Sequence, residues 1–271
     1  MPTTYAHYRF GCGVRQRLGA SERKIIDNNR ELFDWGVHGP DLMFYYHPFF
    51  PGAVNMLGRR YHKTKGCVFF EQQKRWLAPT PGDAADGRGA LSGLPEPETA
   101  YLMGVLCHFV LDRECHPYIG RIQNMKRSHS AIEASFDRLL MEKDGIDPLN
   151  HVPNSHLIVS GHSAEVIRKF YPELTAAQVI GAERGMRQVV SVLASKGLKR
   201  RVLMDLAVII GKRGMFITRE PNPICHESDR TLLELYDRAA ERYPGMLAQL
   251  WDFLLKGEKL GTEFDHTFGR I

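Results

Sequence analysis

The chain has 271 residues, 43% of them hydrophobic, and a formal net charge of +5 at pH 7. This length can bury a substantial core as one large domain or two smaller ones. No stretch approaches the roughly 20 apolar residues that span a bilayer, and the first residues lack the apolar run of a secretion signal. The basic clusters at 196–201 and 211–214 are short, which argues against nucleic acid as the partner.

The cysteines are odd in number and scattered along the chain. They are Cys12, Cys67, Cys107, Cys115 and Cys225. They lack the paired spacing of a disulfide framework or of a thiolate zinc site. We therefore expect a cytoplasmic protein with free thiols.

Helical signals dominate the first half of the chain. Residues 21–35 open with a serine and carry apolar residues at helical spacing, which predicts one helix. Residues 53–77 predict one or two more helices, and the Pro- and Gly-rich segment 78–98 predicts a surface loop that could act as a lid. Pro97 fits the first turn of a further helix, which should end near Pro117.

The second half of the chain also predicts helices, and no segment alternates with the period of a strand. Helices are expected near 128–143, 162–171, 175–197, 199–212, 228–242 and 245–256, with Ser128 and Thr175 as caps. The fold class is therefore all-α. Residues 1–145 are expected to form a metal-site helical core, and residues 155–271 a helical half packed with it as one continuous domain.

The segment "HFVLDRECHPYIG" places His108, Asp112 and His116 at four-residue steps on a helix that otherwise reads as buried. Residues four apart lie on one side of a helix, about 6 Å apart along its axis. Burying these groups without partners would cost several kcal/mol. One ion cannot reach both histidines, because they are separated by about 12 Å of helix. Asp112 could bridge two ions, so the spacing predicts a multinuclear metal site.

The next predicted helix carries a second histidine–carboxylate pair at the same spacing, His129 and Glu133. A short connection places this helix beside the first one, so the pair could complete a second ion together with His116. Carboxylate and imidazole ligands without thiolates are typical of catalytic zinc.

These motifs resemble the zinc-dependent phospholipase C family, whose fold is shared with the P1/S1-type single-strand nucleases. The resemblance is carried by "HFVLDRECHPY", by "SHSAIE" downstream, and by "MPTTYAHYRFG" and "GVHGPDLMFYY". The last two segments are similar to those of intracellular bacterial members in particular. The resemblance covers about the first 145 residues and implies zinc ions in the cleft of an all-helical domain.

The resemblance implies a ligand set for up to three zinc ions. The first ion would take Asp41, His62, His108 and Asp112; the second His116, His129 and Glu133; the third His7, Asp112 and the amino terminus. Secreted relatives offer an amino-terminal tryptophan where this chain begins Met1-Pro2, so two or three ions are expected. Asp41 is also expected to orient or deprotonate the attacking water.

The implied function is zinc-dependent hydrolysis of a phosphodiester, on phospholipid or a related small molecule, with peripheral membrane contact. Phe44, Tyr45 and Tyr46 follow Asp41 and could line a headgroup pocket, although packing around the site is the favoured role for such rings. Leu42 stands where choline-binding relatives have an aromatic residue. A single-strand nuclease or nucleotidase, and a non-catalytic metal-stabilised binding module, remain as alternatives.

Three other polar residues are not assigned as ligands. His38, four residues after Asp34, is expected to be a helix-end group or a group behind the ligands. Asp137, one turn past Glu133, could also lie behind the ligands, although a solvated helix face is the favoured place. His156 has no partner at a recognisable spacing and is expected to be a surface residue. The C-terminal "FDHTFGRI" could cover the cleft, although nothing in the sequence requires it.

Overall fold

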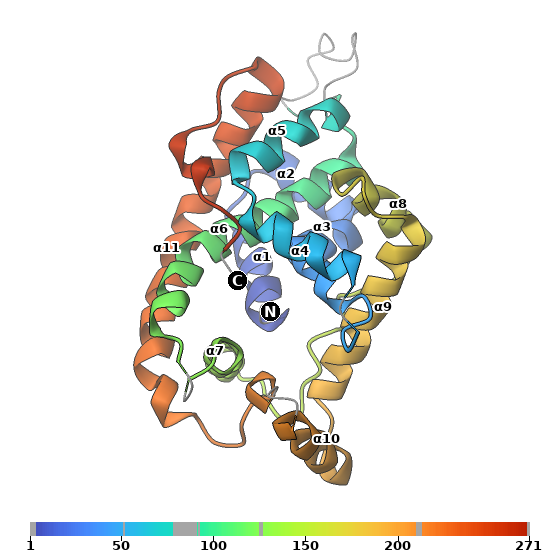
Figure 1. Ribbon diagram of the computed structural model, residues 1–271. Coiled ribbons are helices and arrows are strands. Elements are labelled where there is room, and N and C mark those ends of the chain that lie inside the picture. The colour runs from blue at the N-terminus through green and yellow to red at the C-terminus, as the bar shows by residue number, and fades with distance from the viewer. Residues whose placement is uncertain are drawn as a thin grey trace.

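The computed structural model describes residues 4–50, 52–77, 91, 93–124, 127–209 and 213–269, and in this part of the chain helices are joined by turns and irregular segments (Figure 1). Its α-helices are α1 (Thr4–Gln16), α2 (Ala20–Asn28), α3 (Arg30–Gly36), α4 (Ala53–Lys63), α5 (Gly66–Leu77), α6 (Glu96–Ile122), α7 (His129–Lys143), α8 (Gly161–Phe170), α9 (Ala176–Leu193), α10 (Gly197–Ile209) and α11 (His226–Trp251). A 3₁₀-helix, η1 (Gly39–Tyr45), follows α3. In the described residues the sole β-type pairing is an isolated bridge between Lys65 and Thr267. The predicted all-α class is confirmed.

Helix α6 runs through the middle of the molecule and is buried over most of its length (Figure 1). Helices α3 and α11 pack against it, and α1 and α7 flank its second half. The Tyr243 hydroxyl of α11 donates to the carbonyl oxygen of Met103 over 2.9 Å. Side chains from both predicted halves of the chain therefore share one hydrophobic core around α6.

The crossing of α3 over α6 brings two backbones into direct contact at Gly36 and Gly104. A Cβ on Gly104 would lie 2.4 Å from the carbonyl oxygen of Phe33, and one on Gly36 would lie 2.4 Å from that of Tyr101. Only glycine allows this approach. The contact matters for the site because η1 follows α3 directly, so it fixes Asp41 relative to His108.

Three predicted helix boundaries differ from the structure. The helix expected over 21–35 is broken at Asn29, whose side-chain amide donates to the carbonyl oxygen of Ile25 over 3.1 Å. Helix α6 continues through Pro117, and α11 runs through Pro244 where two helices were predicted. A proline inside a helix removes one hydrogen bond. Here buried residues on both sides of each proline keep the helix in place.

The predicted caps Ser128 and Thr175 are confirmed, since each side chain accepts a hydrogen bond from the backbone three residues later. The segment predicted as a loop at 78–98 lies largely outside the described residues. The five cysteines are unpaired. None of the described helices is long and apolar enough to cross a membrane.

Glu183 is a fully buried carboxyl group between α8 and α9. Its Oε1 accepts a hydrogen bond from the Ser163 hydroxyl over 2.7 Å. Burial raises the pKa of Glu183 from its ordinary value of 4.5 to about 8, and the hydrogen bond from Ser163 only partly opposes this. The folded protein therefore keeps a proton on Glu183 at neutral pH.

We predict that Gly104→Ala destabilises the protein by about 1–3 kcal/mol, because the added methyl group must separate α3 from α6. Gly120→Ala is the matched control on the same helix, where a Cβ meets nothing within 4 Å. It should stabilise the helix by about 0.5–1 kcal/mol. Urea unfolding of both variants measures the difference. Equal stability of the two would show that the close crossing is unimportant.

A second prediction concerns pH. The unfolded chain releases the Glu183 proton at a lower pH than the folded chain, so stability falls as pH rises from 4.5 through about 8. Glu183→Gln removes this loss. Its stability relative to the natural protein should therefore increase by about 2 kcal/mol between pH 6 and pH 8. Chemical unfolding at both pH values tests this, with the exposed Glu165→Gln as control. A pH-independent difference would contradict it.

Candidate metal centre

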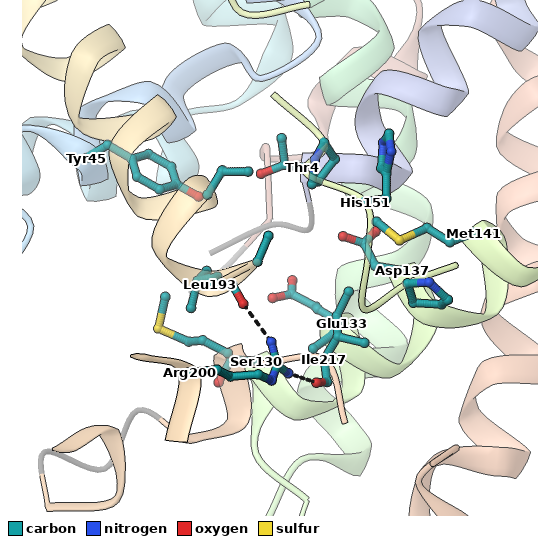
Figure 2. Close-up of a pocket in the computed structure, with 16 residues that line it drawn as sticks. Thr4, Tyr45, Ser130, Glu133, Asp137, Met141, His151, Leu193, Arg200 and Ile217 are labelled. Carbon is teal, nitrogen blue, oxygen red and sulfur yellow. Dashed lines mark hydrogen bonds between the residues drawn. The ribbon is translucent and has the colours of Figure 1, made fainter. Parts of the chain in front are cut away.

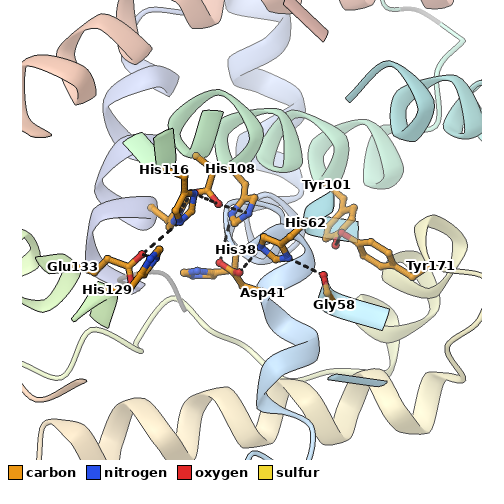
Figure 3. Close-up of polar contacts among 12 residues, drawn as sticks. His38, Asp41, Gly58, His62, Tyr101, His108, His116, His129, Glu133 and Tyr171 are labelled. Carbon is orange, nitrogen blue, oxygen red and sulfur yellow. Dashed lines mark hydrogen bonds and ion pairs between the residues drawn. The ribbon is translucent and has the colours of Figure 1, made fainter. Parts of the chain in front are cut away.

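Eight histidine and carboxylate side chains from five elements converge beside α6. Figure 3 labels Asp41, His62, His108, His116, His129 and Glu133 of this set. They form three groups in which one ligand atom per residue lies within 4.8 Å of the others. The groups are His7, His108 and Asp112; Asp41, His62 and His108; and His116, His129 and Glu133. All are buried except His129, which is half-buried. The structure thus brings together every side chain that the sequence nominated as a metal ligand, whereas the amino terminus lies outside the described residues.

Asp112 lies at the centre of this arrangement, between three imidazoles. Its Oδ1 is 3.2 Å from Nε2 of His7, and its Oδ2 is 3.3 Å from Nε2 of His108 and 3.1 Å from Nδ1 of His116. The four-residue spacing on α6 thus places one carboxylate between two histidines, as the helix geometry predicts.

The charges of the site perturb one another strongly. Burial by itself would raise the pKa of Asp112, but the imidazoles of His116 and His108 outweigh it and hold that pKa well below its usual range. Burial would likewise lower the pKa of His116, but Asp112 and Glu133 raise it to about 10. The carboxylates therefore draw positive charge into a buried space.

The group around Asp41 gives the clearest test of whether a cation fits. Nδ1 of His62 lies 2.8 Å from the carbonyl oxygen of Gly58, which can only accept, so Nδ1 carries the proton. Nε2 of the same ring lies 2.8 Å from Oδ1 of Asp41. This contact lacks the angles of a hydrogen bond, and neither atom has a hydrogen-bond partner in the described part of the chain.

A bound cation would stabilise two buried polar atoms that lie this close together without a hydrogen bond between them. Oδ2 of Asp41 lies 3.7 Å from Nδ1 of His108 and also has no hydrogen-bond partner in the described chain. Ligand atoms on a tetrahedral zinc ion lie about 3.3 Å apart, given bonds of about 2.0–2.1 Å. The contacts around Asp41 lie on either side of this value, so the donor set fits zinc.

The third group stands at the start of α7. The Ser128 side chain accepts a hydrogen bond from the Ala131 N–H over 3.3 Å, which fixes the first turn of the helix. His129 and Glu133 then lie one turn apart, with Nε2 of His129 2.9 Å from Oε1 of Glu133. Nε2 of His116 is 3.6 Å from the same oxygen. On α7, as on α6, the four-residue spacing therefore places a histidine and a carboxylate side by side.

The grouping differs in two respects from the ligand set implied by the family resemblance. Asp41 and His62 are grouped with His108 but not with Asp112, and His108 also joins the group of His7 and Asp112. His108 is therefore shared by two groups, and its two ring nitrogens face different carboxylates.

Asp137 supports this site, and its predicted place on a solvated helix face is wrong. It is buried, and it accepts hydrogen bonds from the backbone N–H groups of Tyr5 at 3.3 Å and Ala6 at 2.8 Å. A carboxylate at a helix N-terminus satisfies N–H groups that have no partner within the helix and interacts favourably with the helix dipole. Asp137 therefore anchors the turn of α1 that carries His7.

The prediction that His156 is a surface residue is also wrong. It is buried, and its Nε2 lies 2.9 Å from Nε2 of His38, so one ring donates and the other accepts. Burial lowers the pKa of His156 to about 3 and that of His38 well below its usual value. The pair is neutral. His38 is the residue at the start of η1, as expected, and the pair holds the turn that carries Asp41.

The C-terminal segment packs directly against the site, which sequence reasoning raised only as a possibility. The Phe268 ring is fully buried, with its centroid 6.1 Å from that of His108. Gly66 N–H donates to the carbonyl oxygen of His266 over 2.8 Å and ties the segment to α5. Gly269 has φ +110°, and a Cβ there would lie 2.4 Å from Nδ1 of His116. The segment forms one wall of the metal centre.

Two cavities adjoin the ligands. One of about 30 Å³ lies among them, bordered by His7, Asp112, His116 and Glu133. The other, of about 80 Å³, shares Glu133 with the site and is shown in Figure 2. We call it the outer pocket. Its wall is mainly aliphatic, and Arg200 is the cation that lines it.

The three aromatic residues that follow Asp41 occupy different environments. Tyr45 lines the outer pocket. The half-buried Phe44 packs on His62 with ring centroids 5.2 Å apart, and the half-buried Tyr46 lies against Gly181 of α9. Of the three, Tyr45 is therefore the one placed to meet a ligand in that pocket.

Fold and site together define an all-helical protein with a buried centre of histidine and carboxylate side chains that suits divalent metal binding. The family model described as zinc dependent phospholipase C matches residues 13–179, well over half of the chain. The chain belongs to the zinc-dependent phospholipase C family. Comparison with curated proteins and with solved structures gave no significant match.

We predict that Gly269→Ala weakens zinc binding at least tenfold, because the added methyl group must displace either the tail or the His116 ring. Gly245→Ala on α11 is the control, since a Cβ there meets nothing within 4 Å. Competition with a chromogenic chelator measures the affinity of both. If Gly269→Ala binds zinc as tightly as the control, the tail does not position His116.

Proposed function

We propose that this protein is a zinc-dependent hydrolase that cleaves phosphodiester bonds in phospholipids or closely related molecules. Three findings support the proposal: family membership, the convergence of eight ligand-type side chains, and the unpartnered atoms of Asp41 and His62. The last finding carries most of the argument, because a polar site this buried is costly to keep without a cation.

The side chains nominated for each ion are those of the three groups above. His108, which belongs to two groups, and Asp112, which contacts His7, His108 and His116, would be shared between neighbouring ions. His116, His129 and Glu133 would hold a more separate ion. The number of ions, two or three, is part of the proposal. Zinc in such a site makes water available as a nucleophile near pH 7 and neutralises charge on phosphoryl oxygens.

Asp41 is the residue we assign to the attacking water. Its carboxylate is fully buried, with Oδ1 toward His62 and Oδ2 toward His108 at the longer distance of 3.7 Å. Oδ2 is therefore the atom with more room to accept a hydrogen bond from water and then its proton. Nδ1 of His62 donates to the Gly58 carbonyl, which fixes the tautomer and orientation of the His62 ring. This ring therefore cannot turn into the space beside Oδ2 of Asp41.

The outer pocket favours a lipid over a nucleic acid. Met141, Val190, Leu193, Met215 and Ile217 provide aliphatic surface, and Arg200 could pair with an anionic group. Proteins that hold single-stranded nucleic acid stack its bases on aromatic side chains. Here Tyr45 and His151 are the pocket's only rings of that kind among the described residues. A nuclease or nucleotidase is therefore the second candidate.

We predict that the metal-stripped protein is inactive on a chromogenic phosphodiester and that zinc restores activity. His116→Ala should lower kcat/KM at least about 100-fold, because residues behind metal ligands already cost 10–100-fold when changed. The exposed His162→Ala is the matched control and should remain active. Elemental analysis of the same samples should show less zinc in His116→Ala.

The alternatives give different outcomes in the same assay series. Zinc binding without turnover of any phosphodiester would favour the non-catalytic module. Faster cleavage of single-stranded DNA than of phosphatidylcholine vesicles would favour the nuclease.

A further inference from the structure

The most exposed large hydrophobic side chains of the described chain gather on two short segments. They are Phe50 at 81% exposure, Leu198 at 74%, Phe49 at 72%, Met56 at 66% and Val202 at 57%. The first segment comprises the loop 47–50 with the first turns of α4, and the second comprises the first turns of α10. Exposing such side chains to water costs free energy, and an apolar surface of this kind usually marks an interaction site.

The first segment is held so that its rings cannot fold back. The side-chain amide of Asn55 donates to the carbonyl oxygens of Met43 at 3.1 Å and Tyr46 at 2.9 Å, and its Oδ1 accepts from the Gly52 N–H over 2.7 Å. Asn55 itself is buried. These bonds fix both ends of the loop, so Phe49 and Phe50 are presented to solvent by a constrained backbone.

Each segment also carries exposed cations. Arg59 and Lys63 lie three and seven residues after Met56, on the same face of α4. Lys196 and Arg201 lie beside Leu198 and Val202 on the second segment. None of these four cations forms an ion pair within the described chain. Arg60 differs, because it pairs with Glu173.

The outer pocket is lined by one residue of the second segment and by one residue that shortly precedes the first. Tyr45 lines the pocket just before the first segment, and Arg200 lines it within the second. Helix α9 runs alongside both: Gly181 and Gly185 contact Tyr46 and Tyr45, and Leu193, its last residue, lines the pocket. Figure 1 shows the 47–50 loop beside α9 and α10 beyond the end of α9.

We propose that these two segments form a docking rim that binds the surface of an anionic phospholipid bilayer. Aromatic and aliphatic side chains enter the headgroup region while neighbouring cations meet anionic lipids, which is the pattern of peripheral membrane attachment. This inference rests on the proposed function, because docking would bring the outer pocket to a bilayer that contains the proposed phospholipid substrate. The unpaired cations favour a lipid surface over a second copy of this chain, which carries the same charges.

The test is sedimentation of the zinc-loaded protein with vesicles. Phosphatidylcholine alone is compared with phosphatidylcholine and phosphatidylglycerol in equal parts. The protein should bind the anionic vesicles more tightly and lose affinity as salt screens the cations. The double variant Phe49→Ser/Phe50→Ser should bind at least tenfold more weakly. Ile224→Ser, an exposed apolar residue outside the rim, should bind normally.

Soluble substrate separates docking from catalysis. Phe49→Ser/Phe50→Ser should hydrolyse a chromogenic phosphodiester at the natural rate and vesicle lipid more slowly. Vesicle binding without any turnover would leave the docking rim standing and contradict the proposed function. Turnover of soluble substrate without vesicle binding would overturn the rim alone. Loss of a dimer in Phe49→Ser/Phe50→Ser by analytical ultracentrifugation would also overturn it, because the surface would then be a subunit interface.

Discussion

The contact between the Asp112 carboxylate and three imidazoles is the constraint around which the molecule is organised. Placing a carboxylate on the most buried helix costs several kcal/mol unless positive charge surrounds it. His108 and His116 come from the same helix, and His7 comes from α1. Cations in the site would complete this compensation, so we infer that the metal-free protein carries an electrostatic penalty that ion binding removes.

Much of the surrounding structure holds the segments that carry the other ligands in position around Asp112. Gly36 and Gly104 let α3 approach α6, which fixes η1 and Asp41. Asp137 holds the first turn of α1, and the Phe268 segment closes the remaining side. These contacts join residues far apart in the chain, so distant substitutions can alter the ligand geometry without touching a ligand.

The proposed chemistry and the proposed membrane contact occupy adjoining regions. The ligands are buried beside α6, the outer pocket adjoins them through Glu133, and Arg200 of the second rim segment lines that pocket. A phosphodiester in a bilayer has an anionic group near an apolar chain. A pocket with an aliphatic wall and one arginine matches both parts of such a molecule.

The sequence by itself determined the helical class, the caps at Ser128 and Thr175, and the four-residue spacings on α6 and α7, because each depends on local periodicity. It also nominated every side chain that converges at the centre. Tertiary structure decided the burial of His156, the role of Asp137, the wall formed by Gly269 and the helices that continue through Pro117 and Pro244. Those features depend on packing between segments distant in the chain, which local spacing does not encode.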